Sequence, residues 1–350
     1  MKYRVHVVGT LFMCACALPL VAIVAHAGEL NPPAGAIQPT GAVLLNQQTT
    51  SGFPIVVSQP GTYRLTSNIT GVAGADGIQI SASGVTLDLN GFSVVGVAGS
   101  FNGVRTIVGV DGLTVMNGSV RNWGADGVSA GTASGGIYKD LRVAGNGNFG
   151  LNVGVSSVCT DCTAFQNGSH GLNLGFNGTL RGCASNNNMG NGIQTGNGAA
   201  ILNCAARDNT LVGIATGTGS SITSCSAYSN NSNGFVMIIG SMISQCVSSS
   251  NGDNGILVTS DCRVMDNCCW GNGTLTANGA GIRTLSSDNR IDRNTMTDND
   301  IGIATGAGIN LKLTNSMSGN TTQQQVAVGD TISITAARGN ATLPHTNFQF

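Results

Sequence analysis

Short stretches of alternating hydrophobic and polar residues recur along most of the chain. Each stretch begins with a glycine and a hydrophobic residue, and eleven such pairs form a series from Gly77-Ile78 to Gly302-Ile303. Five successive intervals between Gly150 and Gly255 are 21 residues long. Hydrophobic residues two positions apart over about three to five residues have the period of a β-strand. The pattern therefore predicts eleven copies of a unit made of short strands and turns.

The five central copies agree position by position when the glycine is numbered 0. Position 12 is always cysteine and position 17 is always asparagine: Cys162, Cys183, Cys204, Cys225 and Cys246, and Asn167, Asn188, Asn209, Asn230 and Asn251. A unit of this size cannot bury its own hydrophobic side chains, so the copies must stack and share a core. We expect the stacked asparagines to hydrogen bond from turn to turn as an asparagine ladder. The cysteines would form a second inward column, a cysteine ladder.

These features resemble the right-handed parallel β-helix repeats of the pectate-lyase-like superfamily, which carry asparagine ladders. The segments 59–63 (Gln-Pro-Gly-Thr-Tyr) and 86–91 (Thr-Leu-Asp-Leu-Asn-Gly) also look like the first turns of exported bacterial members. The resemblance implies an all-β fold, a right-handed parallel β-helix of about eleven rungs with terminal caps. The superfamily includes lyases, glycoside hydrolases, epimerases, phage tailspikes, adhesins and a copper-insertion accessory protein, so the fold does not select an activity.

The pattern divides the chain into four segments. Residues 1–27 contain two basic residues, a hydrophobic run and the sequence Ala25-His26-Ala27, which predicts a signal peptide. An uncleaved anchor helix is the alternative. Residues 28–75 are expected to form a lead-in and cap, residues 76–320 the β-helix, and residues 321–350 a C-terminal cap or tail. We therefore expect a secreted or periplasmic monomer with no membrane span once the signal is removed.

Composition excludes several other classes of protein. The 350 residues include 52 glycines without an every-third-residue rule, so the chain is not a collagen. A single glutamate, Glu29, makes an all-α fold untenable, and 41% hydrophobic residues argue against disorder. The formal net charge is −1, with no basic cluster, so we expect no nucleic-acid partner.

The cysteines are expected to be mostly buried thiols. Cys159 and Cys162 have the spacing of a redox or zinc motif, but both fall at inward positions of the repeat. Cys262, Cys268 and Cys269 lie near a change in repeat length and are more prone to pair or react. A column of thiols also suits a soft metal such as Cu(I), although no metal-ligating residue is assigned.

Position 2 of the repeat faces outward, and in the first half of the chain it carries hydrogen-bonding side chains. We predict that these residues bind substrate, one residue per turn: Gln79, Arg105, Asn152, Asn173 and Gln194. Position 15 forms a second mixed column that includes Phe165, Arg207 and Tyr228. Either column suits an extended ligand, and either is also compatible with an ordinary solvated surface.

Charged residues concentrate between residues 283 and 300. The copy that begins at Gly255 has five additional residues, which we expect to form a loop within 271–280 next to Trp270. By the resemblance, Arg283 would act as a base or anion clamp, and Trp270 would stack on a sugar ring. Asp288 and Asp292 would be acid/base groups or, in a lyase-like site, calcium ligands. Solvated charges that protect the end of the stack are the alternative.

Three function classes remain open. The first is a protein that binds a polysaccharide or cell-surface glycan along an outward strand face and, if it is an enzyme, cleaves it as a lyase or glycoside hydrolase. The second is a non-catalytic structural or adhesive surface rod. The third is periplasmic metal handling through the cysteines. Apart from calcium in the lyase-like case, no cofactor is expected.

Overall fold

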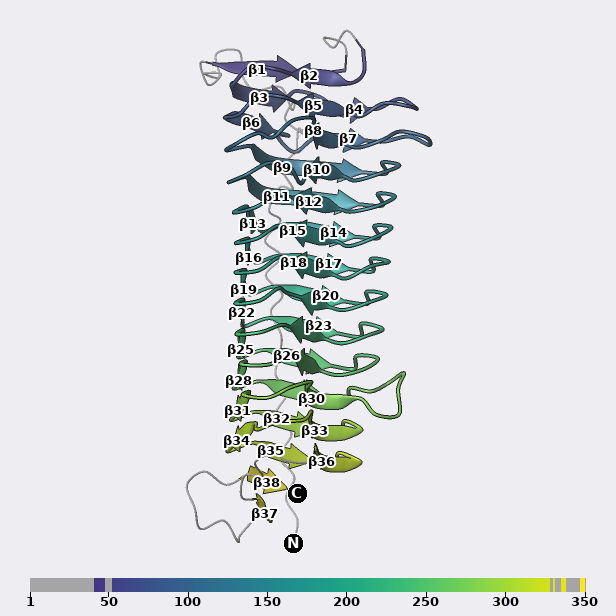
Figure 1. Cartoon of the computed structure of the whole chain (residues 1–350). Helices are drawn as coiled ribbons and strands as arrows, with labels where there is room; N and C mark the ends of the chain where they lie inside the picture. The colour runs from purple at the N-terminus through teal and green to yellow at the C-terminus, as the bar shows by residue number, and fades with distance from the viewer. Residues whose placement is uncertain (1–40, 48–51, 328–329, 331–334, 338–346, 350) are drawn as a thin grey trace, which may run out of the picture. The chain divides into compact units, whose positions relative to one another are not determined.

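The computed structural model describes residues 41–47, 52–327, 330, 335–337 and 347–349, so the predicted signal peptide lies outside the described residues. These residues contain strands and turns but no helix, and no segment among them is a helix long and hydrophobic enough to cross a membrane. All strand pairs are parallel, and successive turns of the chain lie one above another (Figure 1). The fold is a right-handed parallel β-helix, which confirms the predicted fold class.

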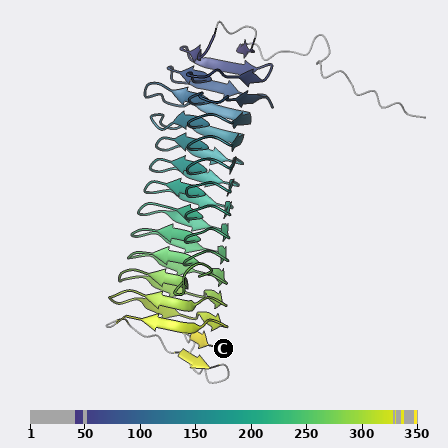
Figure 2. The same ribbon diagram turned by 90° about the vertical axis from the view of Figure 1, so that its right-hand side faces the viewer.

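Each turn contributes one strand to a 13-stranded sheet and further strands to a 25-stranded sheet. The view in Figure 2 shows the strands aligned from turn to turn. The 13-stranded sheet consists of β2 (Ile55–Val57), β5 (Ile78–Ile80), β8 (Val104–Thr106), β10 (Val128–Ala130), β12 (Leu151–Val153), β15 (Leu172–Leu174), β18 (Ile193–Thr195), β21 (Ile214–Ala215), β24 (Phe235–Met237), β27 (Ile256–Val258), β30 (Ala280–Thr284), β33 (Ile301–Thr305) and β36 (Thr322–Val326).

The 25-stranded sheet contains two columns of strands, which the long strands β9 (Thr114–Arg121) and β11 (Ile137–Ala144) join. The first column adds β1 (Ala42–Leu45), β3 (Gly61–Leu65), β6 (Val85–Asp88), β13 (Val158–Thr160), β16 (Thr179–Arg181), β19 (Ala200–Leu202), β22 (Ser221–Thr223), β25 (Met242–Ser244), β28 (Arg263–Met265), β31 (Arg290–Asp292) and β34 (Leu311–Leu313). The second adds β4 (Ile69–Thr70), β7 (Ser93–Val95), β14 (Thr163–Phe165), β17 (Ala184–Asn186), β20 (Ala205–Arg207), β23 (Ser226–Tyr228), β26 (Val247–Ser249), β29 (Cys268–Trp270), β32 (Thr295–Thr297), β35 (Ser316–Ser318), β37 (Thr335–Ala337) and β38 (Asn347–Gln349).

The stack extends beyond the eleven predicted copies at both ends. Strands β1 to β4 lie within residues 41–75, where a lead-in and cap was predicted, and β2 already pairs with β5. At the other end, β36 pairs with β33, and β38 pairs with β35. These end strands lack the glycine and hydrophobic pair that marks the central copies, which is why the repeat pattern did not include them. The loop 271–279 protrudes beside β30, where the additional residues were predicted (Figure 1).

A ladder of buried asparagines runs along one corner of the helix. In each step, the Nδ2 and backbone N–H of one asparagine donate to Oδ1 of the asparagine in the next turn. For Asn188 and Asn209 the two donor–acceptor distances are 3.0 and 3.1 Å. The ladder comprises Asn146, Asn167, Asn188, Asn209, Asn230, Asn251, Asn272, Asn299 and Asn320. The predicted asparagine ladder is therefore confirmed.

The cysteines at position 12 occupy a second corner. There, a sulfur atom accepts a hydrogen bond from a buried backbone N–H group of the neighbouring turn. The backbone N–H of Cys204 donates to Sγ of Cys225 at 3.3 Å, and that of Cys225 donates to Sγ of Cys246, also at 3.3 Å. The backbone N–H of Cys246 then donates to Oδ1 of Asn267 at 3.0 Å, where asparagine replaces cysteine. In this corner, thiol and amide side chains are interchangeable acceptors for a buried N–H group.

A buried ion pair closes the C-terminal end of the core. Lys312 on β34 points inward beside Ile291 of the preceding turn, and its ammonium group binds the carboxylate of Asp330. Thr305 Oγ1 and the backbone N–H of Asn310 also donate to that carboxylate, at 2.6 and 2.7 Å. An inward-pointing charge on the last turns disfavours the addition of another hydrophobic turn or another molecule.

We expect Asn209→Leu to lower the free energy of unfolding by about 2–5 kcal/mol. The backbone N–H and Nδ2 of Asn188 would lose their acceptor, and the carbonyl of Ser185 would lose its side-chain donor. The exposed neighbour Thr210 provides the control, and Thr210→Ala should change stability little. Urea unfolding followed by circular dichroism measures both. Equal midpoints for the two variants would contradict the role of the ladder.

Burial alone would raise the pKa of Asp330, but hydrogen bonds from Lys312, Thr305 and the Asn310 N–H outweigh it and hold the pKa below its usual value of 3.8. A carboxyl group with a depressed folded-state pKa contributes stability above its unfolded pKa, and this contribution is lost as the pH falls through the folded pKa. We expect Asp330→Asn to destabilise the protein by about 3–5 kcal/mol at neutral pH, because Lys312 loses its counter-charge.

The loss of stability between pH 5 and pH 2 should then be smaller in Asp330→Asn than in the unsubstituted protein. Thermal unfolding measured across this range tests the difference. An identical acid-dependent loss in both proteins would show that the pair does not stabilise the C-terminal end.

Candidate functional site

The outer face of the 13-stranded sheet carries the predicted substrate-binding residues. In the regular three-residue strands the first and third side chains are buried, while the middle one reaches the surface. Strand pairing places the five residues in register on successive turns, with Ser129 between the second and third: Gln79, Arg105, Asn152, Asn173 and Gln194. The structure therefore brings all five onto one face.

Two buried aspartates organise the first turns of this face. Asp76, with 2% of its surface exposed, lies in the turn before β5. Its Oδ2 accepts hydrogen bonds from Nε2 of Gln79 at 2.8 Å and from Arg105, whose Nη1 is 3.4 Å away. Its Oδ1 accepts two bonds from Asn102, from the backbone N–H at 2.9 Å and from Nδ2 at 2.8 Å. One carboxylate thus fixes side chains of two successive turns.

Asp126, which is 5% exposed, repeats this arrangement two turns further along. Its backbone N–H donates to Oδ1 of Asn102 at 3.2 Å, which links it to the first aspartate. Its own Oδ1 accepts from Nδ2 of Asn148 at 2.7 Å, and its Oδ2 accepts from Nδ2 of Asn152 at 3.4 Å. Nδ2 of Asn173 then donates to Oδ1 of Asn152 at 2.9 Å. A continuous polar network therefore runs from β5 to β15.

Electrostatics keeps the first aspartate ionised. Burial raises the pKa of Asp76, but the hydrogen bonds from Gln79 and Asn102 and the charge of Arg105 outweigh that effect and lower the pKa below its ordinary value. The guanidinium of Arg105 remains largely at the surface, with 46% of the side chain exposed. The network thus presents a cation held in place by a buried anion.

The next turns continue the polar face with a histidine. Nδ1 of His170 accepts the backbone N–H of Asn191 at 2.8 Å, and its ring packs on Phe149 with centroids 5.4 Å apart. Partial burial lowers the pKa of His170, which favours the neutral imidazole. Nδ2 of Asn191 donates to Oε1 of Gln194 at 2.7 Å, so the last predicted residue is also oriented by a neighbour.

Arg283 lies on β30 near the opposite end of the same face. Its Nε donates to Oδ1 of Asn254 at 2.8 Å, and its Nη2 donates to the carbonyl of Asn278 in the loop 271–279, at 2.6 Å. Arg283 also lines a hollow of about 250 Å³, together with Leu285 and Gln325. A second hollow of about 230 Å³ is lined by Asn278, Gln325 and other residues. Arg283 therefore anchors the loop at the border of two shallow depressions.

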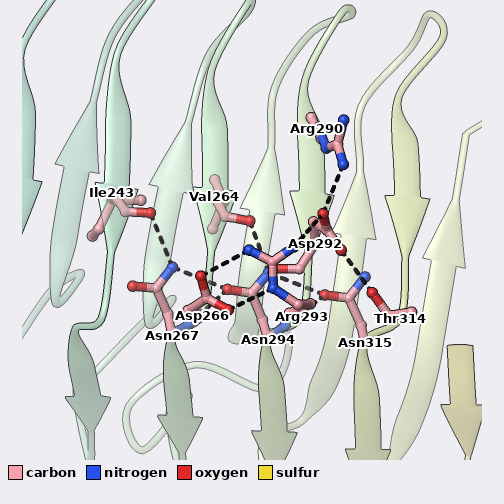
Figure 3. Close-up of polar contacts among 10 residues, drawn as sticks. All are labelled: Ile243, Val264, Asp266, Asn267, Arg290, Asp292, Arg293, Asn294, Thr314 and Asn315. Atoms are coloured by element: carbon pink, nitrogen blue, oxygen red, sulfur yellow. Dashed lines mark hydrogen bonds and ion pairs between the residues drawn. The ribbon is translucent and has the colours of Figure 1, made fainter. Parts of the chain in front are cut away.

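The structure does not bring Asp292 or Asp288 to Arg283. Asp292 is on β31 of the other sheet, buried within the cluster shown in Figure 3. Its Oδ2 pairs with Arg290 at 2.8 Å and with Arg293 at 2.9 Å, and its Oδ1 accepts from Oγ1 of Thr314 at 2.6 Å. Burial raises the pKa of Asp292, but these partners outweigh it and lower the pKa. Such a carboxylate is a structural anion and a poor general acid.

Asp288 is exposed in the turn between β30 and β31, where its side chain accepts a hydrogen bond from Oγ of Ser287 at 2.6 Å. Trp270 also lies on the 25-stranded sheet, at the end of β29. Its Nε1 donates to Oδ2 of Asp298 at 3.1 Å, and 48% of its surface is exposed. The predicted catalytic residues and Trp270 therefore belong to different faces and do not form one site.

Sequence reasoning missed Asp76, Asn102 and Asp126. Each directly precedes the glycine that begins a copy, so the signal was present at position −1. These three side chains accept hydrogen bonds from the following turn.

The cysteines offer no centre for chemistry in the described part of the chain. All nine are free thiols, eight of them buried, and only Cys268 is exposed. Contrary to our expectation, Cys262 and Cys269 lie in the regular register, because the additional residues follow Trp270. Burial raises the pKa of the Cys159 thiol. Among the described residues, no three His, Cys, Asp or Glu side chains are grouped as a metal site.

The sequence of this chain matches no protein-family model and no curated protein. Solved structures do share its fold. The A-module of the mannuronan C-5 epimerase AlgE4 of Azotobacter vinelandii has a TM-score of 0.51 at 15% identity, over 79% of this chain and 91% of that chain. The catalytic unit of the thermostable GH87 alpha-1,3-glucanase of Streptomyces thermodiastaticus strain HF3-3 has a TM-score of 0.52 at 12% identity, over 89% of this chain and 68% of that chain. At these identities the likeness concerns the parallel β-helix itself.

Thiol labelling tests the burial of the cysteines. We expect a membrane-impermeant maleimide to modify Cys268 in the folded protein and to leave the other eight cysteines of residues 28–350 unmodified until denaturant is added. Mass spectrometry of tryptic peptides identifies the modified positions. Rapid labelling of Cys183, Cys204 or Cys225 in the folded state would contradict a closed core.

Proposed function

We propose that this protein binds a polysaccharide along the outer face of the 13-stranded sheet, from Gln79 to Gln194. The proposal rests on one observation. Surface amide groups and one guanidinium group follow each other on successive turns, and two buried aspartates hold their side chains in fixed positions. Groups that are ordered before binding lose little conformational entropy when a ligand arrives.

The dimensions of the face suit an extended glycan. Parallel strands are spaced about 4.8 Å apart, so the side chains from β5 to β18 form a line of about 24 Å. A chain of sugar rings offers hydroxyl groups at regular intervals, and amides can both donate to and accept from them. The similar folds of an epimerase acting on mannuronan and of a glucanase support a polysaccharide as the ligand class.

The charge of this face favours an uncharged sugar segment. Asp76 and Asp126 supply two carboxylates near the single cation Arg105. A uronate at this place would meet net negative charge, whereas hydroxyl groups can pair with the amides and with the remaining guanidinium donors.

Binding without cleavage agrees best with the geometry. Asp76 and Asp126 lie two turns apart, or about 10 Å by strand spacing, near the upper end of the carboxylate separation in inverting glycoside hydrolases. However, hydrogen bonds and a charged partner keep Asp76 ionised, so it is unsuited to protonate a leaving group. Asp292 is neutralised by two arginines. Neither Asp76 nor Asp292 is therefore suited to act as the general acid of a lyase or glycoside hydrolase.

A non-catalytic structural rod is the second candidate function. The internal neutralisation of Asp292 and the closed ladders favour it, because both serve the stack itself. Metal handling through the cysteines has the weakest support, since eight of the nine described thiols are buried and those such as Cys204 and Cys225 form hydrogen bonds with the backbone. Export to the periplasm or medium stays a prediction from residues 1–27.

A glycan array followed by calorimetry with the retained oligosaccharide tests the proposal. We expect at least one neutral polysaccharide to bind, and Arg105→Ala or Asn152→Ala to weaken binding about tenfold. The unsubstituted protein should release neither reducing ends nor unsaturated products from the retained polysaccharide. Arg263→Ala, which removes an exposed arginine from the other sheet, is the matched control and should bind normally.

Retention of no polysaccharide at all would favour the structural rod. Equal weakening by Arg105→Ala and Arg263→Ala would place the ligand elsewhere on the molecule.

A further inference from the structure

A column of large side chains follows the outside of the 25-stranded sheet, on its second set of strands. Strand pairing places its members in register on eight successive turns: Arg121, Ala144, Phe165, Asn186, Arg207, Tyr228, Ser249 and Trp270. We call this column the aromatic–arginine strip. It lies on a different sheet from Gln79 and Arg105, so it does not depend on the function proposed above.

The large side chains of the strip form two series, each with a spacing of two turns. Arg121, Phe165 and Arg207 are separated from one another by two turns, and Tyr228 and Trp270 are also two turns apart. Each interval contains one short side chain. At about 4.8 Å per turn, the members of each series are about 10 Å apart, which is about the length of an extended disaccharide, and the two series meet at Arg207 and Tyr228 on adjacent turns.

The two rings at the C-terminal end are open to solvent. Tyr228 is 49% exposed and Trp270 is 48% exposed, although isolated large aromatic side chains are usually more buried. The hydrogen bond from Nε1 of Trp270 to Asp298 fixes the indole. Aromatic faces held in this way pack against the apolar C–H faces of sugar rings with little loss of conformational entropy.

The neighbouring outward position on these strands forms a low floor beside the strip. From β14 to β26 it holds Thr163, Ala184, Ala205, Ser226 and Val247. A ligand can therefore lie along these short side chains and be flanked by the taller rings and guanidinium groups.

The charged side chains that project from the strip itself are arginines, and carboxylates adjoin it at Asp208 and at Asp298, the partner of Trp270. At the two outward positions of these strands, from Ser119 to Trp270, there are three arginines and no carboxylate: Arg121, Arg142 and Arg207. Within the described residues, the first two form no ion pair. Arg207 has only an exposed partner, Asp208, at 3.7 Å, and such surface pairs contribute little.

We propose that the aromatic–arginine strip binds an acidic polysaccharide, an extended uronate-containing chain whose disaccharide repeat matches two turns of the helix. Arg121, Arg142 and Arg207 pair with the carboxylates, for which a guanidinium offers two parallel donors. Tyr228 and Trp270 stack on sugar rings. The strip thereby gives the protein a second glycan-binding face with a charge preference opposite to that of the face around Asp76 and Asp126.

Affinity electrophoresis of the full chain in gels containing polygalacturonate tests this proposal, with methyl-esterified polygalacturonate as the uncharged form of the same backbone. We expect Tyr228→Ala/Trp270→Ala to reduce retention by both forms about tenfold or more. We expect Arg121→Gln/Arg207→Gln to reduce retention by the acidic form only and to weaken its dependence on salt.

Matched controls separate the strip from other surfaces. Arg181→Gln/Arg263→Gln removes two exposed arginines from the other column of the same sheet and should leave retention unchanged. Trp270→Phe keeps a ring and should restore most of the binding that is lost in Trp270→Ala. Circular dichroism and urea unfolding of each variant show that the β-helix is intact.

Three results would overturn the proposal. The first is no retention of the unsubstituted protein by polygalacturonate. The second is equal loss in the strip variants and in Arg181→Gln/Arg263→Gln. The third is loss in Arg105→Ala with no loss in any strip variant, which would place the acidic chain on the 13-stranded face; polysaccharide binding at that face would stand, but its preference for uncharged sugars would not.

Discussion

The structure depends on one constraint, the need to satisfy buried backbone N–H groups at the corners of a stacked coil. Strand pairing satisfies the amides along each side, but an amide at a corner faces the interior and requires a side-chain acceptor from the next turn. Asparagine supplies it along the first corner, as between Asn188 and Asn209. Cysteine supplies it between Cys204 and Cys225, and serine between Ser220 and Ser241 in a third corner. The asparagine, cysteine and serine residues that recur at these corners are therefore the ones that supply the acceptors.

The surface inherits its order from the same constraint. Because every turn is fixed to the next at its corners, outward side chains on equivalent strands lie in straight columns. The face around Asp76 and Asp126 and the aromatic–arginine strip are two such columns, on different sheets. One provides amides held by buried carboxylates, and the other provides rings and cations above a floor of short residues. A single repeat length thus produces two extended surfaces of opposite charge character.

The sequence predicted the fold, the asparagine ladder and the outward column from Gln79 to Gln194, because the glycine and hydrophobic pair that begins each copy assigns inward and outward positions even where the interval is longer than 21 residues. It did not reveal that Arg283 and Asp292 lie on different sheets. A side of the helix holds only a few residues, so positions nine apart in the chain, such as Arg283 and Asp292, fall on different sheets. Proximity in sequence is therefore a poor guide to proximity on this fold. Asp76 and Asp126 escaped notice because they lie just before the glycine, at a turn position whose residue type varies from copy to copy.

The hydrogen bonds of these three corners run in one direction, opposite to those that Asp76 and Asn102 accept from the following turn. In each of the three corners, an N–H group of one turn donates to a side chain of the following turn, and the third corner ends when Asn310 donates to the carboxylate of Asp330. The two ends of these ladders are therefore chemically different. At the N-terminal end the side-chain acceptors face the preceding turn, and at the C-terminal end the N–H groups need an acceptor. A middle turn can be duplicated during evolution without new chemistry, whereas an added turn at the C-terminal end must displace a charged terminator. The direction of these hydrogen bonds therefore favours lengthening of the β-helix by duplication of central turns, while the two terminal turns are kept.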